Sequence, residues 1–149
     1  MSEHVAEIDW QRGEAEFRYE TYPRDHLWRF GGGVEVPASS APDFLGSASR
    51  VDPEEALVAA LSSCHMLTFL ALAARKRIVV ESYRDRAVGT LAKNEAGRLA
   101  VARVSLRPEV RFAEPQSEEV VARLHQQAHE HCFIANSVTT EVLVEPPVG

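Results

Sequence analysis

The two cysteines, Cys64 and Cys132, are the residues of this sequence whose type most readily supports chemistry. Two cysteines are too few for the disulfide scaffold of a small secreted protein. The stretch that starts at Met1 has neither the basic nor the apolar segment of a secretory signal, so we expect a cytoplasmic protein. In that compartment a cysteine pair is more typical of catalysis, redox chemistry or metal binding than of a structural disulfide.

The two cysteines occupy different contexts. Cys64 lies in the middle of an apolar stretch with helical spacing, where a free cysteine can simply be a small buried hydrophobe. Cys132 follows the end of a second predicted helix, which is a more accessible place for a thiol. These positions alone leave Cys64 open as either a core residue or a reactive thiol.

The histidines offer a different kind of site. His125, His129 and Cys132 fall on one face of a helix, a geometry that zinc or copper could accept. No fourth ligand is evident, and two histidines four residues apart are common on helices. Cys64 and His65 do not make a hydrolase dyad, because adjacent helical residues point about 100° apart. A metal-binding module is therefore a minor alternative.

Length and composition indicate one ordinary globular domain spanning residues 1–149. The 149 residues are 45% hydrophobic and 26% charged, which argues against disorder. A net charge of −6 argues against nucleic acid and against an anionic membrane surface as partners. No run approaches the roughly 20 uninterrupted apolar residues of a membrane span.

The clearest element is a long helix that begins after Asp52. Asp52 is suited to be its N-cap, Pro53 to the first helical position, and Glu55 to the third position of a capping box. An apolar stretch of good helix formers follows and ends in the basic run 75–77. Because the helix is apolar nearly all round, we expect it to be the buried spine of the fold.

Strands flank this helix in the predicted order. We expect strands at residues 4–10, 14–20 and 27–30, a loop at 37–49, and strands at 79–91 and 99–112 with an edge or bulge at Pro108. Ser117 should cap a second helix over residues 118–131, and residues 139–144 should close the chain as a strand. This order predicts an α+β fold with a mainly antiparallel sheet.

The segment from Asp52 to Cys64, DPEEALVAALSSC, resembles the helix start of the OsmC/Ohr family of osmotically induced and organic hydroperoxide resistance proteins. The family pattern is Asn/Asp-Pro-Glu, an apolar helix, and a reactive cysteine that matches Cys64. A second cysteine at a helix end matches Cys132, and the order of elements also fits. Family members often have Cys-Pro at that cysteine, where this sequence has Phe133. The resemblance covers nearly the whole chain and implies an OsmC-like fold.

The resemblance also implies a thiol peroxidase with Cys64 as peroxidatic and Cys132 as resolving cysteine. Such an enzyme attacks the peroxide with a thiolate, forms a sulfenic acid and condenses it to a disulfide. The thiolate is the nucleophile, so the pKa of the peroxidatic thiol must be lowered. A mid-helix cysteine gains little from the helix dipole, which fades within a turn, so an arginine must supply the positive field.

In the family a Gly-Arg-Asp turn supplies this arginine, and the segment 22–25, Tyr-Pro-Arg-Asp, resembles that turn. The resemblance thereby implies Arg24 as the thiolate activator and Glu54 as its orienting partner. Arg29 and Arg12 are the second and third candidates, and a plain surface role for Arg24 stays open.

Helix geometry leads to an expected homodimer. Glu54 and Cys64 lie ten residues apart, about 15 Å along a straight helix and roughly 80° apart in direction. Glu54 cannot reach Cys64 of its own chain, although the resemblance places both in one site. Either a partner helix supplies Glu54, or the long side chain of Arg24 bridges the gap. Because the long helix is apolar nearly all round, we favour the first possibility, in which a partner chain supplies Glu54 in an intertwined dimer.

The expected function is the reduction of organic hydroperoxides by thiols. Neighbours of the cysteines, Leu61, Leu67, Phe69 and Phe133, would form an apolar wall that favours greasy peroxides. No metal, flavin or haem cofactor is needed, because sulfur carries the electrons. A dithiol of the lipoyl type is the family's expected reductant. The alternative is a redox-sensing or small-molecule-binding protein of the same fold.

Overall fold

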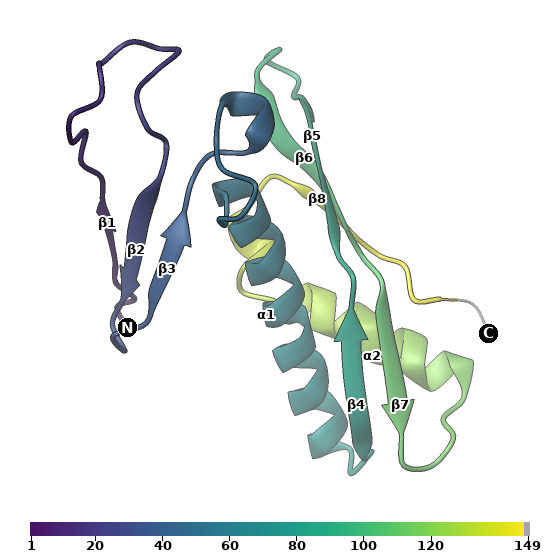
Figure 1. Ribbon diagram of the computed structural model, residues 1–149. Helices are drawn as coiled ribbons and strands as arrows, with labels where there is room; N and C mark the ends of the chain where they lie inside the picture. The colour runs from purple at the N-terminus through teal and green to yellow at the C-terminus, as the bar shows by residue number, and fades with distance from the viewer. Residues whose placement is uncertain (148–149) are drawn as a thin grey trace. The chain divides into compact units, whose positions relative to one another are not determined.

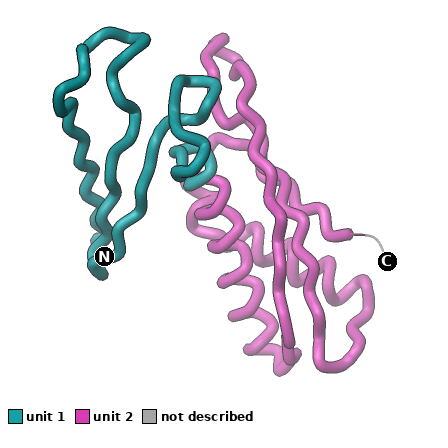
Figure 2. Tube along the Cα trace, viewed as in Figure 1, with its two compact units in different colours: residues 1–56 teal, residues 57–149 magenta. Residues whose placement is uncertain are grey.

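A computed structural model describes residues 1–147, and its chain divides into two compact units. Unit 1 comprises residues 1–56 and unit 2 begins at residue 57 (Figure 2). Strands and helices mix in an α+β arrangement with one long helix and mainly antiparallel sheets, which confirms the predicted class (Figure 1).

Unit 1 is built on a three-stranded antiparallel sheet with the order β1-β2-β3. Its elements are β1 (Ala6–Asp9), β2 (His26–Phe30), β3 (Glu35–Ala38) and the short 3₁₀ helix η1 (Pro42–Phe44). The loop around η1 closes on itself at Gly46, where a Cβ would lie 1.6 Å from the carbonyl oxygen of Ser40. Strand β3 extends to Ala38 and so includes the first two residues of the loop predicted at 37–49. That prediction was only partly right.

The predicted strand at residues 14–20 is absent from the structure, which has turns there. The Thr21 hydroxyl and the Arg18 amide both donate to the Glu16 carbonyl, so the backbone closes locally. Phe17 packs against Trp10 and Tyr22. The alternating pattern was misleading because β2 takes the place beside β1, and this segment becomes the connection between them.

The long helix α1 (Pro53–Arg75) begins as the sequence predicted. The Glu55 amide donates to Asp52 Oδ1 at 2.8 Å, and the Asp52 amide donates to Glu55 Oε1 at 3.2 Å. These reciprocal bonds form a capping box that satisfies two amides at the helix start.

Burial along α1 is one-sided. Four residues at four-residue spacing are fully buried: Leu61, His65, Phe69 and Ala73. On the opposite side another series at the same spacing is exposed: Ala59, Ser63, Leu67 and Ala71. The prediction of burial all round therefore holds for one face only. By length and composition α1 could cross a membrane, yet the core of unit 2 is built on its buried face.

Unit 2 carries two sheets and the second helix. Its elements are β4 (Val80–Asp85), β5 (Val88–Lys93), β6 (Leu99–Leu106), β7 (Pro108–Phe112), α2 (Glu118–His131), η2 (Ala135–Ser137) and β8 (Glu141–Val144). Strands β4 and β7 pair antiparallel; β6 pairs antiparallel with β5 and parallel with β8. The break between β6 and β7 lies at Arg107, and Pro108 is the first residue of β7, a strand position that proline tolerates. The Ser117 hydroxyl accepts from the Val120 amide and caps α2, as predicted.

Two apolar clusters hold unit 2 together on the buried face of α1. In the first, Phe69 and Ala73 pack with Leu124 and Ala128 of α2. In the second, Leu61 packs with Val104 and Leu106 of β6. The two clusters fix α1 against α2 at one end and against the β5-β6-β8 sheet at the other.

A polar pair lies in this otherwise apolar core. The rings of His65 and His125 stack with an interplanar angle of 6°, and Nε2 of His65 lies 3.0 Å from Nδ1 of His125. Burial lowers the pKa of His65 to about 4, with His125 and His129 adding to the effect. Burial likewise lowers the pKa of His125 to about 4, against a small opposing effect of Asp85. Both rings are therefore neutral at physiological pH.

The neutral pair makes stability pH-dependent. Both folded pKa values lie below the ordinary 6.5, so the pair's contribution is fully present above pH 6.5 and is lost as the pH falls towards 4. The unfolded chain then binds protons that the folded chain rejects, at a slope of up to about 1.4 kcal/mol per pH unit for each histidine. Urea unfolding between pH 7.5 and 4.5 measures this slope.

The control compares His125→Phe with His4→Asn. His4 is an exposed histidine outside the core, so His4→Asn is the matched control for the loss of a histidine. Replacing His125 removes one titrating group, so the slope should become shallower. Equal slopes in wild type and His125→Phe would contradict the prediction.

Candidate functional site

The two cysteines lie together in unit 2. Cys64 is on the fourth turn of α1, and Cys132 is the C-cap of α2. Both thiols are free; Cys64 is partly exposed, whereas Cys132 is 1% exposed. The Cys132 thiol is close enough to Cys64 to hydrogen bond with it. The sequence separates these residues widely, and the packing of α1 on α2 brings them into contact.

Burial makes Cys132 a poor acid. Burial and the hydrogen bond with Cys64 raise the pKa of the Cys132 thiol to about 11. Hydrogen bonds from the backbone amides of Ala135 and Ile134 act in the opposite direction. The Ala135 nitrogen lies 3.5 Å from Sγ. At neutral pH Cys132 is thus a protonated thiol beside the more accessible Cys64.

The four apolar residues predicted to line the site divide into two pairs. Leu61 and Phe69 are fully buried and belong to the core clusters of unit 2. Leu67, three residues after Cys64, is 61% exposed, and Phe133, directly after Cys132, is 81% exposed. Leu67 and Phe133 are therefore the two of the four that can contact a molecule from solvent.

Arg24 lies in unit 1 and its guanidinium is held from two sides. It donates to the carbonyl oxygens of Tyr19 and Tyr22, the latter at 2.7 Å, and its Cζ lies 3.6 Å from the centroid of the Tyr22 ring. The neighbouring Asp25 accepts from the Ser47 hydroxyl, which lowers its pKa, and pairs with Arg50 at 3.2 Å. Asp25 thus anchors the turn that carries Arg24.

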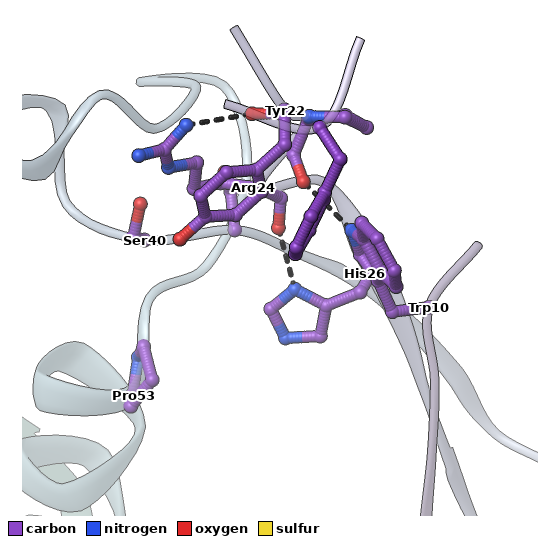
Figure 3. A pocket seen from close by; sticks show the side chains of 9 residues that line it. Trp10, Tyr22, Arg24, His26, Ser40 and Pro53 are labelled. Atoms are coloured by element: carbon purple, nitrogen blue, oxygen red, sulfur yellow. Dashed lines mark hydrogen bonds between the residues drawn. The ribbon is translucent and has the colours of Figure 1, made fainter. Parts of the chain in front are cut away.

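Arg24 also lines a pocket of about 440 Å³ in unit 1 (Figure 3). Trp10, Phe17 and Tyr22 supply aromatic walls, and His26 accompanies Arg24 as a polar lining residue. The Arg24 carbonyl lies 2.7 Å from His26 Nδ1, and the indole of Trp10 donates to the Pro23 carbonyl. The turn at residues 22–25 is therefore tied to Trp10, which directly follows β1, and to the first residue of β2.

The remaining candidate residues have local contacts. Glu54 is partly buried in the first turn of α1, where a carboxylate favours the helix dipole. Arg29 pairs with Glu35 at 3.0 Å and with Asp9 at 3.3 Å across the exposed sheet of unit 1. Arg12 donates to the Ala15 carbonyl at 3.5 Å. The roles expected of Arg24 and Glu54 stay predictions.

The proposed metal ligands are not assembled. His125 pairs with His65 in the core, away from the arrangement that a shared ligand set with His129 and Cys132 would need. Within residues 1–147, no group of three or more His, Cys, Asp or Glu side chains is placed to hold a metal ion. The His65–His125 pair was not predicted, although His65 interrupts an otherwise apolar stripe of the sequence.

Comparisons with known proteins assign the fold. The model of the OsmC family, described as OsmC-like protein, matches residues 46–146. An OsmC-like protein of unknown function from Vibrio cholerae is 48% identical, with a TM-score of 0.92 over 99% of this chain and 100% of that chain. No curated protein matches the chain.

More distant structures share the fold. An organic hydroperoxide resistance protein from Elizabethkingia anophelis has a TM-score of 0.77 at 16% identity, over 100% of this chain and 98% of that chain. The organic hydroperoxide resistance protein OhrB of Bacillus subtilis has a TM-score of 0.65 at 17% identity, over 96% and 98%. The family match spans all of α1, which is a core helix of this fold and not a membrane span. This chain belongs to the OsmC-like protein family.

Proposed function

We propose that this protein is a thiol-dependent peroxidase that reduces organic hydroperoxides through a cycle of two cysteines. In the first step the Cys64 thiol and ROOH give Cys64 sulfenic acid and ROH. In the second step the Cys132 thiol attacks the sulfenic sulfur, which forms the disulfide and releases water. Two external thiols then reduce the disulfide and complete the cycle.

The contact between Cys64 and Cys132 carries this proposal. The chain has two cysteines, and both lie in unit 2 with their thiols within hydrogen-bonding reach. A resolving thiol must approach the sulfenic sulfur to the length of an S–S bond, about 2.05 Å. Cysteines that already lie close together in the reduced protein need little movement to do so. The distant relatives named for hydroperoxide resistance add support from the shared fold.

The different environments of the two thiols support Cys64 as the peroxidatic and Cys132 as the resolving cysteine. Cys64 is partly exposed, so a peroxide can reach it, whereas Cys132 is buried and its pKa is raised to about 11. A thiol with so high a pKa is a weak nucleophile towards a substrate from solvent. It can still attack a neighbouring sulfenic acid, because the reaction is intramolecular.

Arg24 is our candidate for the activator of Cys64, and Glu54 for the residue that orients it. A guanidinium beside a thiolate lowers the thiol pKa by favouring the charged form. Arg24 belongs to a turn that Asp25 anchors, and its charge has no carboxylate partner among the ion pairs of the described residues. An unneutralised guanidinium is the form that such a role requires.

The direct test is consumption of cumene hydroperoxide with a dithiol such as dihydrolipoamide as reductant. Wild-type protein should turn over many equivalents, and Cys64→Ser should turn over none. Arg24→Lys keeps the charge but loses the planar fork, so it should retain part of the activity that Arg24→Ala loses. Equal turnover by wild type and Cys64→Ser would remove the proposal.

The cycle predicts an intramolecular disulfide. Treatment with one equivalent of peroxide should lower the protein mass by two hydrogens, and peptide mapping should link Cys64 to Cys132. Cys132→Ser should instead accumulate sulfenic and then sulfinic acid at Cys64. If wild-type protein yields only sulfinic or sulfonic Cys64, Cys132 is not the resolving cysteine.

Organic peroxides should be better substrates than hydrogen peroxide. Leu67 and Phe133 are exposed beside the two cysteines, and each buried CH₂ group contributes about 0.8 kcal/mol. The value of kcat/KM for cumene hydroperoxide should exceed that for hydrogen peroxide by at least about tenfold, as burial of two such groups requires. Phe133→Ser should narrow the ratio, whereas Leu99→Ser, at the exposed first residue of β6, should not. Equal efficiencies would indicate a generic thiol.

We further propose a homodimer with active sites shared between chains. The exposed stripe of α1 contains the small side chains of Ala59, Ser63 and Ala71, which suit close packing of two helices. Glu54 and Cys64 are separated by about 15 Å along α1, so a partner's helix is the simplest source of a carboxylate for each site.

Complementation tests the shared site. Cys64→Ser and Glu54→Ala proteins, each inactive alone, are refolded together in equal amounts. Half of the dimers are then mixed, and one site in each has both residues, so about a quarter of all sites should recover. The double variant mixed with Glu54→Ala is the control and should recover none. A monomer by light scattering, or no recovery in the mixture, would exclude the arrangement.

A further inference from the structure

The segment after α2 folds back over the end of that helix. We name residues 132–138 the Cys132 turn. Cys132 leaves the helical conformation with a ψ of 116°, and the chain then closes into η2. Ile134, Ala135 and Val138 pack on the cluster that contains Leu61. Phe133 is 81% exposed, so it provides little packing to hold the cysteine beside it.

Asn136 ties this turn to the helix end. Its side-chain amide donates to the carbonyl oxygens of Cys132 at 2.9 Å and of Glu130 at 3.0 Å. Its backbone amide donates to the same Cys132 carbonyl at 3.1 Å. The last carbonyls of a helix have no partner within the helix, and here one exposed side chain satisfies two carbonyls at its end.

The same turn also makes hydrogen bonds to the sulfur of Cys132. With the Cys132 carbonyl fixed by two bonds from Asn136, the backbone amides of Ile134 and Ala135 hydrogen bond to Sγ. These amides favour the thiolate, and burial of Cys132 opposes it. The position of the sulfur and its ability to ionise therefore depend on the same turn.

We propose that Asn136 is the positioning residue of the resolving cysteine, which it holds against Cys64 for disulfide formation. This inference rests on the proposed peroxidase cycle and concerns its second step. In that step the S–O bond of Cys64 sulfenic acid breaks as the S–S bond to Cys132 forms. The proton of the Cys132 thiol leaves with the hydroxide as water, so no further reactant is needed. Asn136 itself contacts neither sulfur.

The test separates the two steps in Asn136→Ala. Dimedone trapping after single additions of peroxide measures sulfenic acid formation at Cys64. In Asn136→Ala this step should proceed at the wild-type rate. Disulfide formation should slow by at least about tenfold, because two hydrogen bonds to backbone carbonyls are lost. Excess peroxide should consequently drive Cys64 of the variant to sulfinic acid at concentrations that the wild type survives.

Ser137→Ala is the matched control. Ser137 lies in the same turn, is exposed, and donates to the Phe133 carbonyl at 2.7 Å, so its loss also removes a side-chain to backbone bond. Ser137→Ala should keep the wild-type rate of disulfide formation. A slowing in Ser137→Ala equal to that in Asn136→Ala would show that general loosening is responsible, and would overturn the proposal. Asn136→Asp, whose carboxylate cannot donate, should behave like Asn136→Ala.

A second measurement needs no peroxide chemistry. Ellman's reagent should react first with the accessible Cys64 and release one thionitrobenzoate. Attack by Cys132 on the mixed disulfide then forms the Cys64–Cys132 disulfide and releases a second thionitrobenzoate. Asn136→Ala should slow only the second, concentration-independent phase. A wild-type second phase in this variant refutes the positioning role, whereas failure of the peroxidase assay with a slowed second phase refutes only the proposed function.

Discussion

The packing of α1 and α2 around one buried cluster is the constraint on which the candidate site depends. Phe69 and Ala73 of α1 share this cluster with Leu124 and Ala128 of α2. The cluster holds the C-terminal end of α2 near the fourth turn of α1, so Cys132 lies next to Cys64. A larger side chain at either alanine would act on the thiol contact through the helix spacing.

The same packing gives the two thiols different properties. Cys132 is covered by the core, which raises its pKa, and backbone amides of the following turn partly offset that effect. Cys64, on the flank of α1 between its buried and exposed faces, keeps contact with solvent. One helix–helix contact therefore produces an accessible thiol and a shielded thiol in direct contact, which is the asymmetry that a two-cysteine cycle uses.

The histidine pair shows how the core accommodates polar groups next to this site. His65 follows Cys64 in sequence but points into the core, where it meets His125 one turn before His129. One nitrogen of each neutral ring can hydrogen bond to the other ring. Phe69 packs against His125 with 4.5 Å between the ring centroids. The hydrogen bond between His65 and His125 thus crosses from α1 to α2 beside the apolar contacts, and it requires at least one neutral ring, because one nitrogen must accept.

The sequence by itself determined the local features: the capping box at Asp52 and Glu55, the Ser117 cap of α2, the chain order of most elements, and through the Pro-Glu to Cys pattern the OsmC-like family. These depend on contacts within a few residues or on a pattern that can be read directly. Only the tertiary structure decided which face of α1 is buried and that residues 14–20 form a connection. An alternating pattern does not name its pairing partner, and a helix that is apolar all round does not choose a face. Those choices depend on which strands and helices pack together, and such contacts join residues far apart in the chain.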